Sequence, residues 1–443
     1  MTTPAEIIPL KRDITLNPER GVLRFMTAGD VDDGKSTLIG RLLLETGAIY
    51  SDQMAALVRA SRRRGEATID LSLLTDGLEA EREQGITIDV AYRYFSHGER
   101  KYIIADAPGH EEYTRNMATA ASRADAAVIL VDATKGVTRQ TARHFALARL
   151  LGVRHFIVAV NKMDLAAFSR RAFVERAREV AALAGKLGLV DTVSVPVSAT
   201  AGEHVAARRG AMPWYEGPTV LDALERLDPA RDLGPQPFRF FVQLVGRPLQ
   251  PGQGRRLMGR VESGTVAPGM EVWIYPGARS ARVRTVLGLD GPVERAQAGD
   301  AVTLVLDREL DVSRGSLIAS PASPPTVNTV AQATLCWFDR EPLREGAPYA
   351  LKLGTRTVKA RVLEVESRLD MDTLADGPVG EALQANDIAR VTLLFQEPLA
   401  FDPYAIHRGT GSFILIDEWS ARTVAAGMVL DSAPTLGAHD WAA

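Results

Sequence analysis

The residues Gly29–Ser36 have the sequence GDVDDGKS, which matches the phosphate-binding pattern G-x-x-x-x-G-K-[ST]. In such a loop, backbone N–H groups and the N-terminus of the following helix bind phosphate oxygens. The lysine, here Lys35, contacts the β- and γ-phosphates, and the hydroxyl of Ser36 binds Mg²⁺. The apolar run Val22–Ala28 precedes the loop and a helical pattern over Lys35–Glu45 follows it, as the motif requires. The sequence therefore predicts a nucleoside triphosphate site.

A second segment, Asp106–Gly109 (DAPG), follows the apolar run Tyr102–Ala105. We expect Asp106 to hold a water on Mg²⁺ and the Gly109 N–H to meet the γ-phosphate, as the hydrolysis of GTP requires. His110 comes directly after Gly109, where a side chain can position the attacking water, as a glutamine does in small GTPases.

A third segment, Asn161–Asp164 (NKMD), predicts which base is bound. The Asp164 carboxylate can accept hydrogen bonds from N1–H and the 2-amino group of guanine, a donor pair that adenine lacks. The sequence therefore predicts GTP rather than ATP. Ser198 and Ala199 follow the apolar run Val193–Val197, and we expect the Ala199 N–H to support the guanine edge.

A GTP-dependent switch also needs a hydroxyl that closes on Mg²⁺ when the γ-phosphate is present. Thr87, within Glu83–Asp89 (EQGITID), fits this role. The predicted catalytic residues are His110, Thr87 and Lys35, and the predicted Mg²⁺ ligands are Ser36, Thr87 and, through a water, Asp106. The residues predicted to bind the nucleotide are Gly29, Asp30, Val31, Asp32, Asp33, Gly34, Lys35, Ser36, Thr37, Asp106, Ala107, Pro108, Gly109, His110, Asn161, Lys162, Asp164, Ser198 and Ala199.

Alternating short apolar runs and helical patterns surround these motifs between Val22 and Val197. The predicted strands are Val22–Ala28, Tyr102–Ala105, Ala126–Val131, His155–Val160 and Val193–Val197, and the predicted helices are Lys35–Glu45, His110–Ala121, Thr138–Leu151 and Arg170–Leu187. Unbroken apolar strands that alternate with helices predict a parallel sheet covered on both faces. Thr87–Phe95 and Lys101–Ala105 are close enough in sequence to form an antiparallel hairpin at one edge.

After about Pro235, the helical periodicity disappears and short β-rich runs recur with Gly and Pro between them, which predicts small β-barrels. The expected fold is an α/β P-loop GTPase domain followed by two small antiparallel β-barrels. We expect an N-terminal extension at 1–21, the GTPase domain at 22–234, the barrels at 235–322 and 323–436, and a tail at 437–443. A length of 443 residues agrees with three domains of about 150 residues each.

The composition is that of an ordinary globular protein, with 46% hydrophobic and 24% charged residues and a net charge of −3. This balance argues against a dedicated polyanion binder, so no nucleic-acid partner is expected. The single cysteine, Cys336, indicates a reducing compartment and a cytoplasmic location, and it cannot form an internal disulfide. The N-terminal residues lack the apolar core of a signal peptide, and no apolar run of 18 residues predicts a membrane span.

The motifs together resemble those of the translation-factor GTPases, and Gly259–Val266 (GRVESGTV) resembles the barrel that follows their GTPase domain. Within that superfamily, the chain is most similar to the GTPase subunit of bacterial sulfate adenylyltransferase. The segments that carry this resemblance are Val31–Leu43 (VDDGKSTLIGRLL), Asp76–Phe95 (DGLEAEREQGITIDVAYRYF), Glu111–Thr119 (EEYTRNMAT), Met212–Thr219 (MPWYEGPT) and Phe413–Glu418 (FILIDE).

The resemblance implies a GTPase with GTP and Mg²⁺ as cofactors and a smaller, adenylyl-transferring partner subunit. The pair would convert ATP and sulfate to adenosine 5′-phosphosulfate and pyrophosphate, and GTP hydrolysis would drive this uphill reaction. The adenylyl transfer itself would belong to the partner. Asp30 and Ala107 depart from the family pattern, as does the segment Leu257–Arg260.

Two alternatives remain open at this point. The first is an elongation-factor-type GTPase that delivers aminoacyl-tRNA, against which Asp32-Asp33, the Tyr92–Phe95 strand and the slightly acidic charge balance argue. The second is a version of the same sulfate-activating complex whose product serves sulfation of a metabolite rather than cysteine synthesis, which the sequence does not distinguish.

Overall fold

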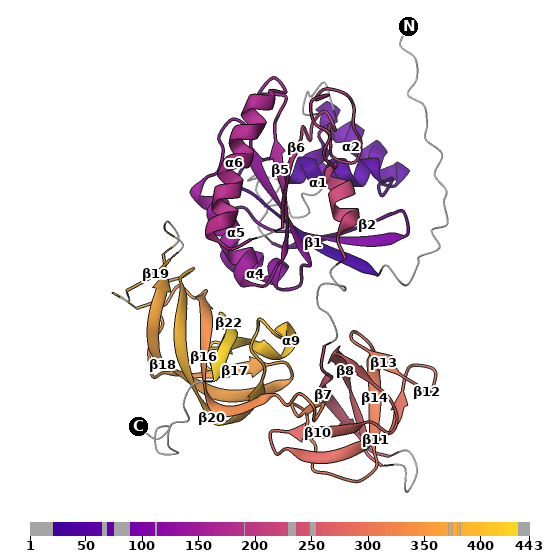
Figure 1. The fold of residues 1–443 in the computed structure, drawn as a ribbon, viewed down its shortest axis with the longest axis vertical. Helices are drawn as coiled ribbons and strands as arrows, with labels where there is room; N and C mark the ends of the chain where they lie inside the picture. Colours follow the sequence, from indigo (N-terminus) through magenta and orange to yellow (C-terminus); the bar gives the residue numbers. More distant parts are fainter. Residues whose placement is uncertain are drawn as a thin grey trace. The chain divides into compact units, whose positions relative to one another are not determined.

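The computed structural model describes residues 21–63, 69–74, 89–110, 113–189, 191–228, 236–248, 254–370, 373, 375–378, 380 and 382–432. The chain divides into two compact units (Figure 1). The first comprises Met1–Asp232 with Met371–Leu374, and the second comprises Leu233–Asp370 with Ala375–Ala443.

In the described part of the first unit, six strands form one sheet in the order β2-β3-β1-β4-β5-β6. Their bounds are β1 Val22–Ala28, β2 Ala91–His97, β3 Arg100–Asp106, β4 Ala126–Asp132, β5 His155–Asn161 and β6 Thr192–Pro196. Neighbours from β3 to β6 pair in parallel, and β2 pairs antiparallel with β3 at one edge. The carboxyl ends of the parallel strands therefore share one edge, where the predicted site motifs begin.

The helices of this unit follow the strands that they cover. Their bounds are α1 Lys35–Glu45, α2 Ser51–Arg63, the 3₁₀ helix η1 Leu71–Leu74, α4 Thr114–Ser122, α5 Arg139–Leu150, α6 Arg170–Lys186 and α7 Val220–Arg226. α5 begins with a capping box in which Thr138 Oγ1 accepts a hydrogen bond from the Thr141 N–H at 3.1 Å. The helix predicted over His110–Ala121 is shorter than expected, because the described helix begins at Thr114.

Burial of the sheet explains why its central strands β4 and β5 are apolar without alternation. Every residue of β4 is buried, and leucine and isoleucine side chains of α1 pack against β1 and β4 in one cluster with those of α7. α5 covers the opposite face, where Phe145 stacks on Phe156 of β5 with ring centroids 5.3 Å apart. Cover on both faces is the physical reason for the continuous apolar runs. No helix in the described part of the chain combines the length and apolar character needed to cross a membrane.

In the second unit, the described strands form two antiparallel barrels, each closed by six strands. The first closes because β10 pairs with both β15 and β11, and the second because β17 pairs with both β21 and β18. The strands of the first barrel's sheet are β7 Arg239–Gly246, β8 Arg256–Ser263, β10 Glu271–Tyr275, β11 Arg279–Leu287, β12 Pro292–Val293, β14 Ala301–Leu306 and β15 Leu317–Ala319. β9 Thr265–Val266 and β13 Ala296–Gln297 form a separate two-stranded sheet.

The second barrel contains β16 Thr326–Trp337, β17 Pro348–Leu353, β18 Arg356–Leu369, β19 Asp376–Gly377, β20 Ile388–Phe401, the short helix α9 Arg408–Gly411, β21 Ser412–Ile416 and β22 Thr423–Ser432. The topology of both units confirms the predicted fold class. Cys336 lies buried on β16, which agrees with a role as a small core residue.

A buried ion pair joins the two barrels within this unit. Arg239 on β7 is 1% exposed and donates through Nε and Nη2 to both carboxylate oxygens of Asp402, each at 2.8 Å. Thr410 Oγ1 donates to the same carboxylate at 2.5 Å. Burial by itself raises the pKa of Asp402, but the hydrogen bonds from Arg239 and Thr410 outweigh it, so the pKa lies below its ordinary value.

Replacing Asp402 with Asn should destabilise the second unit strongly, because a buried guanidinium loses its counter-charge. We expect a loss of about 3–5 kcal/mol in the free energy of unfolding, measured by urea denaturation. Because the folded pKa is depressed, the wild-type contribution is present above the unfolded pKa of about 3.9 and is lost as the pH falls through the folded pKa.

The matched control for Asp402 is Glu418→Gln, which breaks the exposed pair between Lys359 Nζ and Glu418 at 3.5 Å. That change should alter stability by about 1 kcal/mol or less. Equal losses of unfolding free energy in the two variants would contradict the larger contribution expected from the buried pair.

Candidate functional site

The loop Gly29–Ser36 joins the end of β1 to the start of α1. Gly34, at the N-cap of α1, has φ of 91°, and a Cβ there would stand 2.5 Å from Asn161 Nδ2. Both its conformation and its close neighbour therefore require glycine. Because glycine has no side chain to cap the helix, the first N–H groups of α1 are left for an external anion.

Two carboxylates of the loop accept hydrogen bonds from the loop's own backbone N–H groups. The Asp30 N–H donates to Asp33 Oδ2 at 2.8 Å, and Asp30 Oδ1 accepts from the Val31 N–H at the same distance. Asp33 is 2% exposed, and burial raises its pKa, although the Asp30 N–H and the Lys35 charge oppose the shift. Asp32 has φ of 67°, which aspartate tolerates better than most residues.

The side chain of Lys35 folds back into the loop Gly29–Ser36. Its Nζ donates to the carbonyl oxygens of Gly29 at 2.9 Å and Asp30 at 3.2 Å, and its side chain is buried. Burial lowers the pKa of this ammonium group, while Asp106 and Asp33 act in the opposite direction. The loop carbonyls therefore hold the amine within the segment that the sequence predicts to bind phosphate.

The segment that follows β3 lies directly against this lysine. A Cβ on Gly109 would stand 2.5 Å from Lys35 Nζ and 2.7 Å from the Gly29 carbonyl oxygen, so only glycine permits the approach. Asp106 is 1% exposed and accepts a hydrogen bond from Thr27 Oγ1 at 3.1 Å. Two motifs that are far apart in the sequence thus form one site.

His110 stands next to this contact and is exposed, with its ring 6.3 Å from that of Tyr113 in an edge-on arrangement. Ala107 and Pro108, the other members of the segment, are buried. The exposure of His110 leaves its ring able to face a ligand in solution.

The base-recognition residues assemble at the ends of β5 and β6. Ser198 Oγ donates to Asp164 Oδ1 at 2.6 Å, which orients the carboxylate predicted to bind guanine. Asn161 Nδ2 donates to the Asp33 carbonyl at 2.8 Å, and Asn161 Oδ1 accepts from the Ala199 N–H at 3.0 Å. The Ala199 N–H, which we expect to meet the base, thus has a protein partner here. The Asn161 amide therefore joins the loop Gly29–Ser36 to the residues that follow β6.

Sequence reasoning missed several residues that support this site. Asp132, at the end of β4, binds Lys162 Nζ at 2.8 Å; burial raises its pKa, but hydrogen bonds from Lys162 and Thr134 prevail and lower it. The sequence did contain a signal for it, namely a polar residue directly after a buried apolar run. Gln140 Nε2 donates to the Gly109 carbonyl at 2.8 Å, a contact that depends on how α5 docks and leaves no local signal.

Ser36 and Asp106 are the described candidates for holding Mg²⁺. Their hydroxyl and carboxylate oxygens suit a hard cation that keeps several water or phosphate ligands. Thr87, the third predicted ligand, lies outside the described residues. Among the described residues, no three His, Cys, Asp or Glu side chains gather as a metal site.

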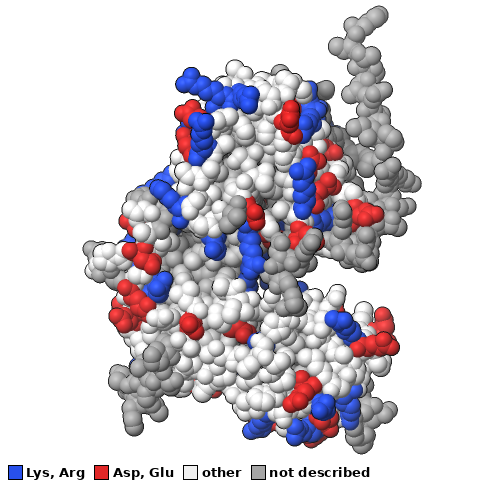
Figure 2. All heavy atoms as spheres, viewed as in Figure 1, with Lys and Arg blue, Asp and Glu red and all other residues white. Residues whose placement is uncertain are grey.

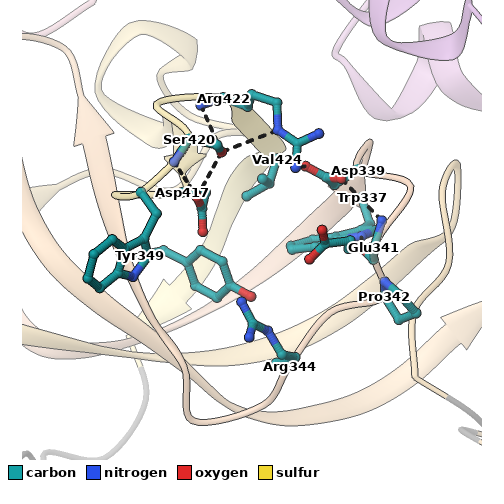
Figure 3. Close-up of a pocket in the computed structure, with 11 residues that line it drawn as sticks. Trp337, Asp339, Glu341, Pro342, Arg344, Tyr349, Asp417, Ser420, Arg422 and Val424 are labelled. Atoms are coloured by element: carbon teal, nitrogen blue, oxygen red, sulfur yellow. Dashed lines mark hydrogen bonds and ion pairs between the residues drawn. The ribbon is translucent and has the colours of Figure 1, made fainter.

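A separate hollow of about 320 Å³ opens on the second barrel (Figure 3). Tyr349 and Trp337 line it, and two of its carboxylates have partners there: Asp339 pairs with Arg422 at 3.3 Å and Asp417 accepts from Ser420 Oγ at 2.8 Å. It contains none of the residues predicted for the nucleotide site.

Comparison with known families agrees with this arrangement over most of the chain. The family described as elongation factor Tu GTP binding domain matches residues 20–230. Elongation factor Tu domain 2 matches residues 254–319, and the family described as GTP-eEF1A C-terminal domain-like matches residues 330–430.

Individual proteins are similar to this chain over most of its length. Sulfate adenylyltransferase subunit 1 of Shewanella oneidensis is 47% identical over 95% of this chain and 88% of its own length. The bifunctional enzyme NodQ of a Rhizobium species is 46% identical over 94% of this chain, which spans 64% of that longer protein. Among solved structures, Sup35 complexed with GDP is 23% identical, covering 94% of this chain and 95% of its own, with a TM-score of 0.44.

Replacing Asp164 with Asn should transfer nucleotide preference from GTP to xanthosine triphosphate, because xanthine has an oxygen where guanine has its 2-amino group. We expect GTP affinity to fall about 10- to 100-fold, as for the loss of a hydrogen bond to a charged group. Equilibrium binding of both nucleotides measures the change. The control Asp191→Asn removes an exposed carboxylate before β6 and should leave the preference unaltered; an Asp164 variant that still prefers GTP would refute the assignment.

Proposed function

Because this chain belongs to the family of sulfate adenylyltransferase subunit 1, we propose that it is the GTP-hydrolysing subunit of such an enzyme. A smaller partner subunit would transfer the adenylyl group. The observation that carries the proposal is that one unit contains both the contact of Gly109 with Lys35 and the hydrogen bond from Ser198 Oγ to Asp164. These contacts bring groups for phosphate and for guanine together in one unit.

The proposed overall reaction joins two chemical steps. On the partner, a sulfate oxygen attacks the α-phosphorus of ATP, and pyrophosphate leaves, giving adenosine 5′-phosphosulfate. On this chain, water attacks the γ-phosphorus of GTP and yields GDP and phosphate. The phosphate–sulfate anhydride is high in energy, so the first step is uphill and needs the second to drive it.

In this proposal the chain binds both the phosphates and the guanine base of GTP. The open N–H groups at the start of α1 and the Lys35 ammonium would meet the phosphates, while Asp164 would accept from the guanine ring. Ser36 would hold Mg²⁺ directly and Asp106 through a water, with Thr87 added in the triphosphate state. The cation supplies neutralisation of the charge on the phosphate oxygens.

Water attack would depend on the segment that ends at His110. Gln140 holds the Gly109 carbonyl, which fixes the orientation of the peptide unit that links Gly109 to His110. The exposed His110 ring can then place a water against the γ-phosphate. Positioning and electrostatic stabilisation account for most of the catalysis in this reaction class.

Delivery of aminoacyl-tRNA is the competing function. On the face in Figure 2, acidic and basic side chains of the described residues are interspersed and form no continuous basic surface. A protein that binds a polyanion over a large area gathers positive charge instead. Similarity to sulfate adenylyltransferase subunit 1 over 95% of this chain favours the sulfate-activation proposal.

Replacing His110 with Ala should lower the rate of GTP hydrolysis roughly 100-fold or more while leaving GTP affinity nearly unchanged, because the side chain acts on water and not on the nucleotide. Single-turnover hydrolysis and equilibrium binding separate the two quantities. His97→Ala, an exposed histidine at the end of β2, is the control. An unaffected rate in the His110 variant would remove this residue from the mechanism.

The coupling itself is tested with the chain co-purified with its native partner. ATP plus sulfate should stimulate phosphate release from GTP, and adenosine 5′-phosphosulfate should accumulate only with hydrolysable GTP. Omission of sulfate is the control. A rate of GTP hydrolysis that is unchanged by ATP and sulfate would contradict coupling. GTP-dependent binding of charged tRNA would then support the delivery function.

A further inference from the structure

We propose that Arg41 and Glu45, on the outer face of α1, are positioning residues that fasten the base-recognition loop to the phosphate-binding helix and thereby set guanine affinity and selectivity. The base-recognition loop is defined here as residues 198–211. The inference rests on the proposed function, because it deepens the assignment of the same GTP site.

Arg41 bridges the helix to the part of the loop nearest the base. Its Nε donates to the Ala199 carbonyl at 3.0 Å, and its Nη2 donates to the Thr200 carbonyl. The planar guanidinium offers donors in a fixed geometry, so it holds two successive carbonyls in a way that an ammonium group does not. Burial lowers the pKa of Arg41, while the Glu45 carboxylate opposes this shift.

Glu45 provides the second attachment one helical turn further on, on the same face of α1. Its Oε2 accepts from the Ala206 N–H at 3.2 Å, and its Oε1 pairs with Arg209 Nη2 at 2.7 Å. Arg209 Nε in turn donates to the Gly202 carbonyl at 3.2 Å. α1 therefore contacts the base-recognition loop both near its first residues and near its last residues.

The loop is braced internally, so that these attachments reach the base-recognition groups. Glu203 is 1% exposed, and its carboxylate accepts from the N–H groups of Arg209 and Ala211, each at 3.0 Å. Ser198 and Glu203 exchange backbone hydrogen bonds at 3.0 and 3.2 Å. Displacement of Ala199 or Arg209 would therefore be transmitted to Ser198.

Ser198 and Ala199 are the groups that orient Asp164 and Asn161, by the contacts described above. α1 thus carries the phosphate-binding residues at its first turn and holds the guanine-binding loop through its last turns. Release of Arg41 should loosen the base end without touching Gly109 or His110. Affinity and base selectivity should then fall while the hydrolytic step stays intact.

The test compares Arg41→Ala with the wild-type full chain. Dissociation constants are measured for GDP, GTP and inosine triphosphate, which lacks the 2-amino group, and hydrolysis is followed at saturating GTP. We expect GDP and GTP to bind about tenfold or more weakly, as for loss of a charged hydrogen-bond donor. The preference for GTP over inosine triphosphate should shrink, and kcat should change less than about twofold, as for a step in which Arg41 takes no part.

Two further variants separate positioning from general destabilisation. Arg41→Lys keeps the charge and one donor and should recover part of the affinity and selectivity, whereas Arg149→Ala, an exposed arginine on α5, should match wild type. Unchanged dissociation constants in Arg41→Ala would overturn the inference, as would a parallel fall of kcat and affinity. Failure of the wild-type chain to bind GTP would instead refute the proposed function.

Discussion

Lys35 can occupy its own loop, and Gly109 can lie against it, only because Gly109 has no side chain. A single methyl group there would meet the lysine nitrogen and a loop carbonyl at less than van der Waals distance. The rest of the site is arranged around this contact: β1 and β3 are neighbours in register, Asp106 stands beside Thr27, and Gln140 holds the Gly109 carbonyl. The close approach of two backbones is therefore the constraint on which the phosphate end of the site depends.

The parts of the molecule that local pattern determines were predictable. β1 and α1 have the expected bounds, because a buried apolar run, a glycine turn and a helical periodicity follow one another without ambiguity. The hairpin edge and the change to barrels after Pro235 likewise follow from short-range turn and strand signals. The helix predicted from His110 begins instead at Thr114, since helical periodicity does not show where the backbone first turns into the helix.

What the sequence concealed are contacts between segments distant along the chain. Arg41 with Ala199, Gln140 with Gly109 and Arg239 with Asp402 each join elements whose juxtaposition depends on tertiary packing. None has a characteristic spacing. Asp132 is the intermediate case, because its place at a strand end was visible although its partner Lys162 was not. Motif spacing thus identified the groups proposed to meet the ligand, while the groups that orient them emerged only in three dimensions.

Asp30, which departs from the family pattern, connects the loop Gly29–Ser36 to the N-terminus of α5. Thr138 Oγ1, which caps that helix, also donates to Asp30 Oδ2 at 3.0 Å, and Gln140 in the same turn holds Gly109. α5 has 12 residues and is therefore about 18 Å long. A rotation of about 5° at its capped end would carry its far end through roughly 1.5 Å over that length. Because the capped end of α5 contacts both Asp30 and Gly109, a rotation of the helix about that end would move its far end further than the contacts themselves.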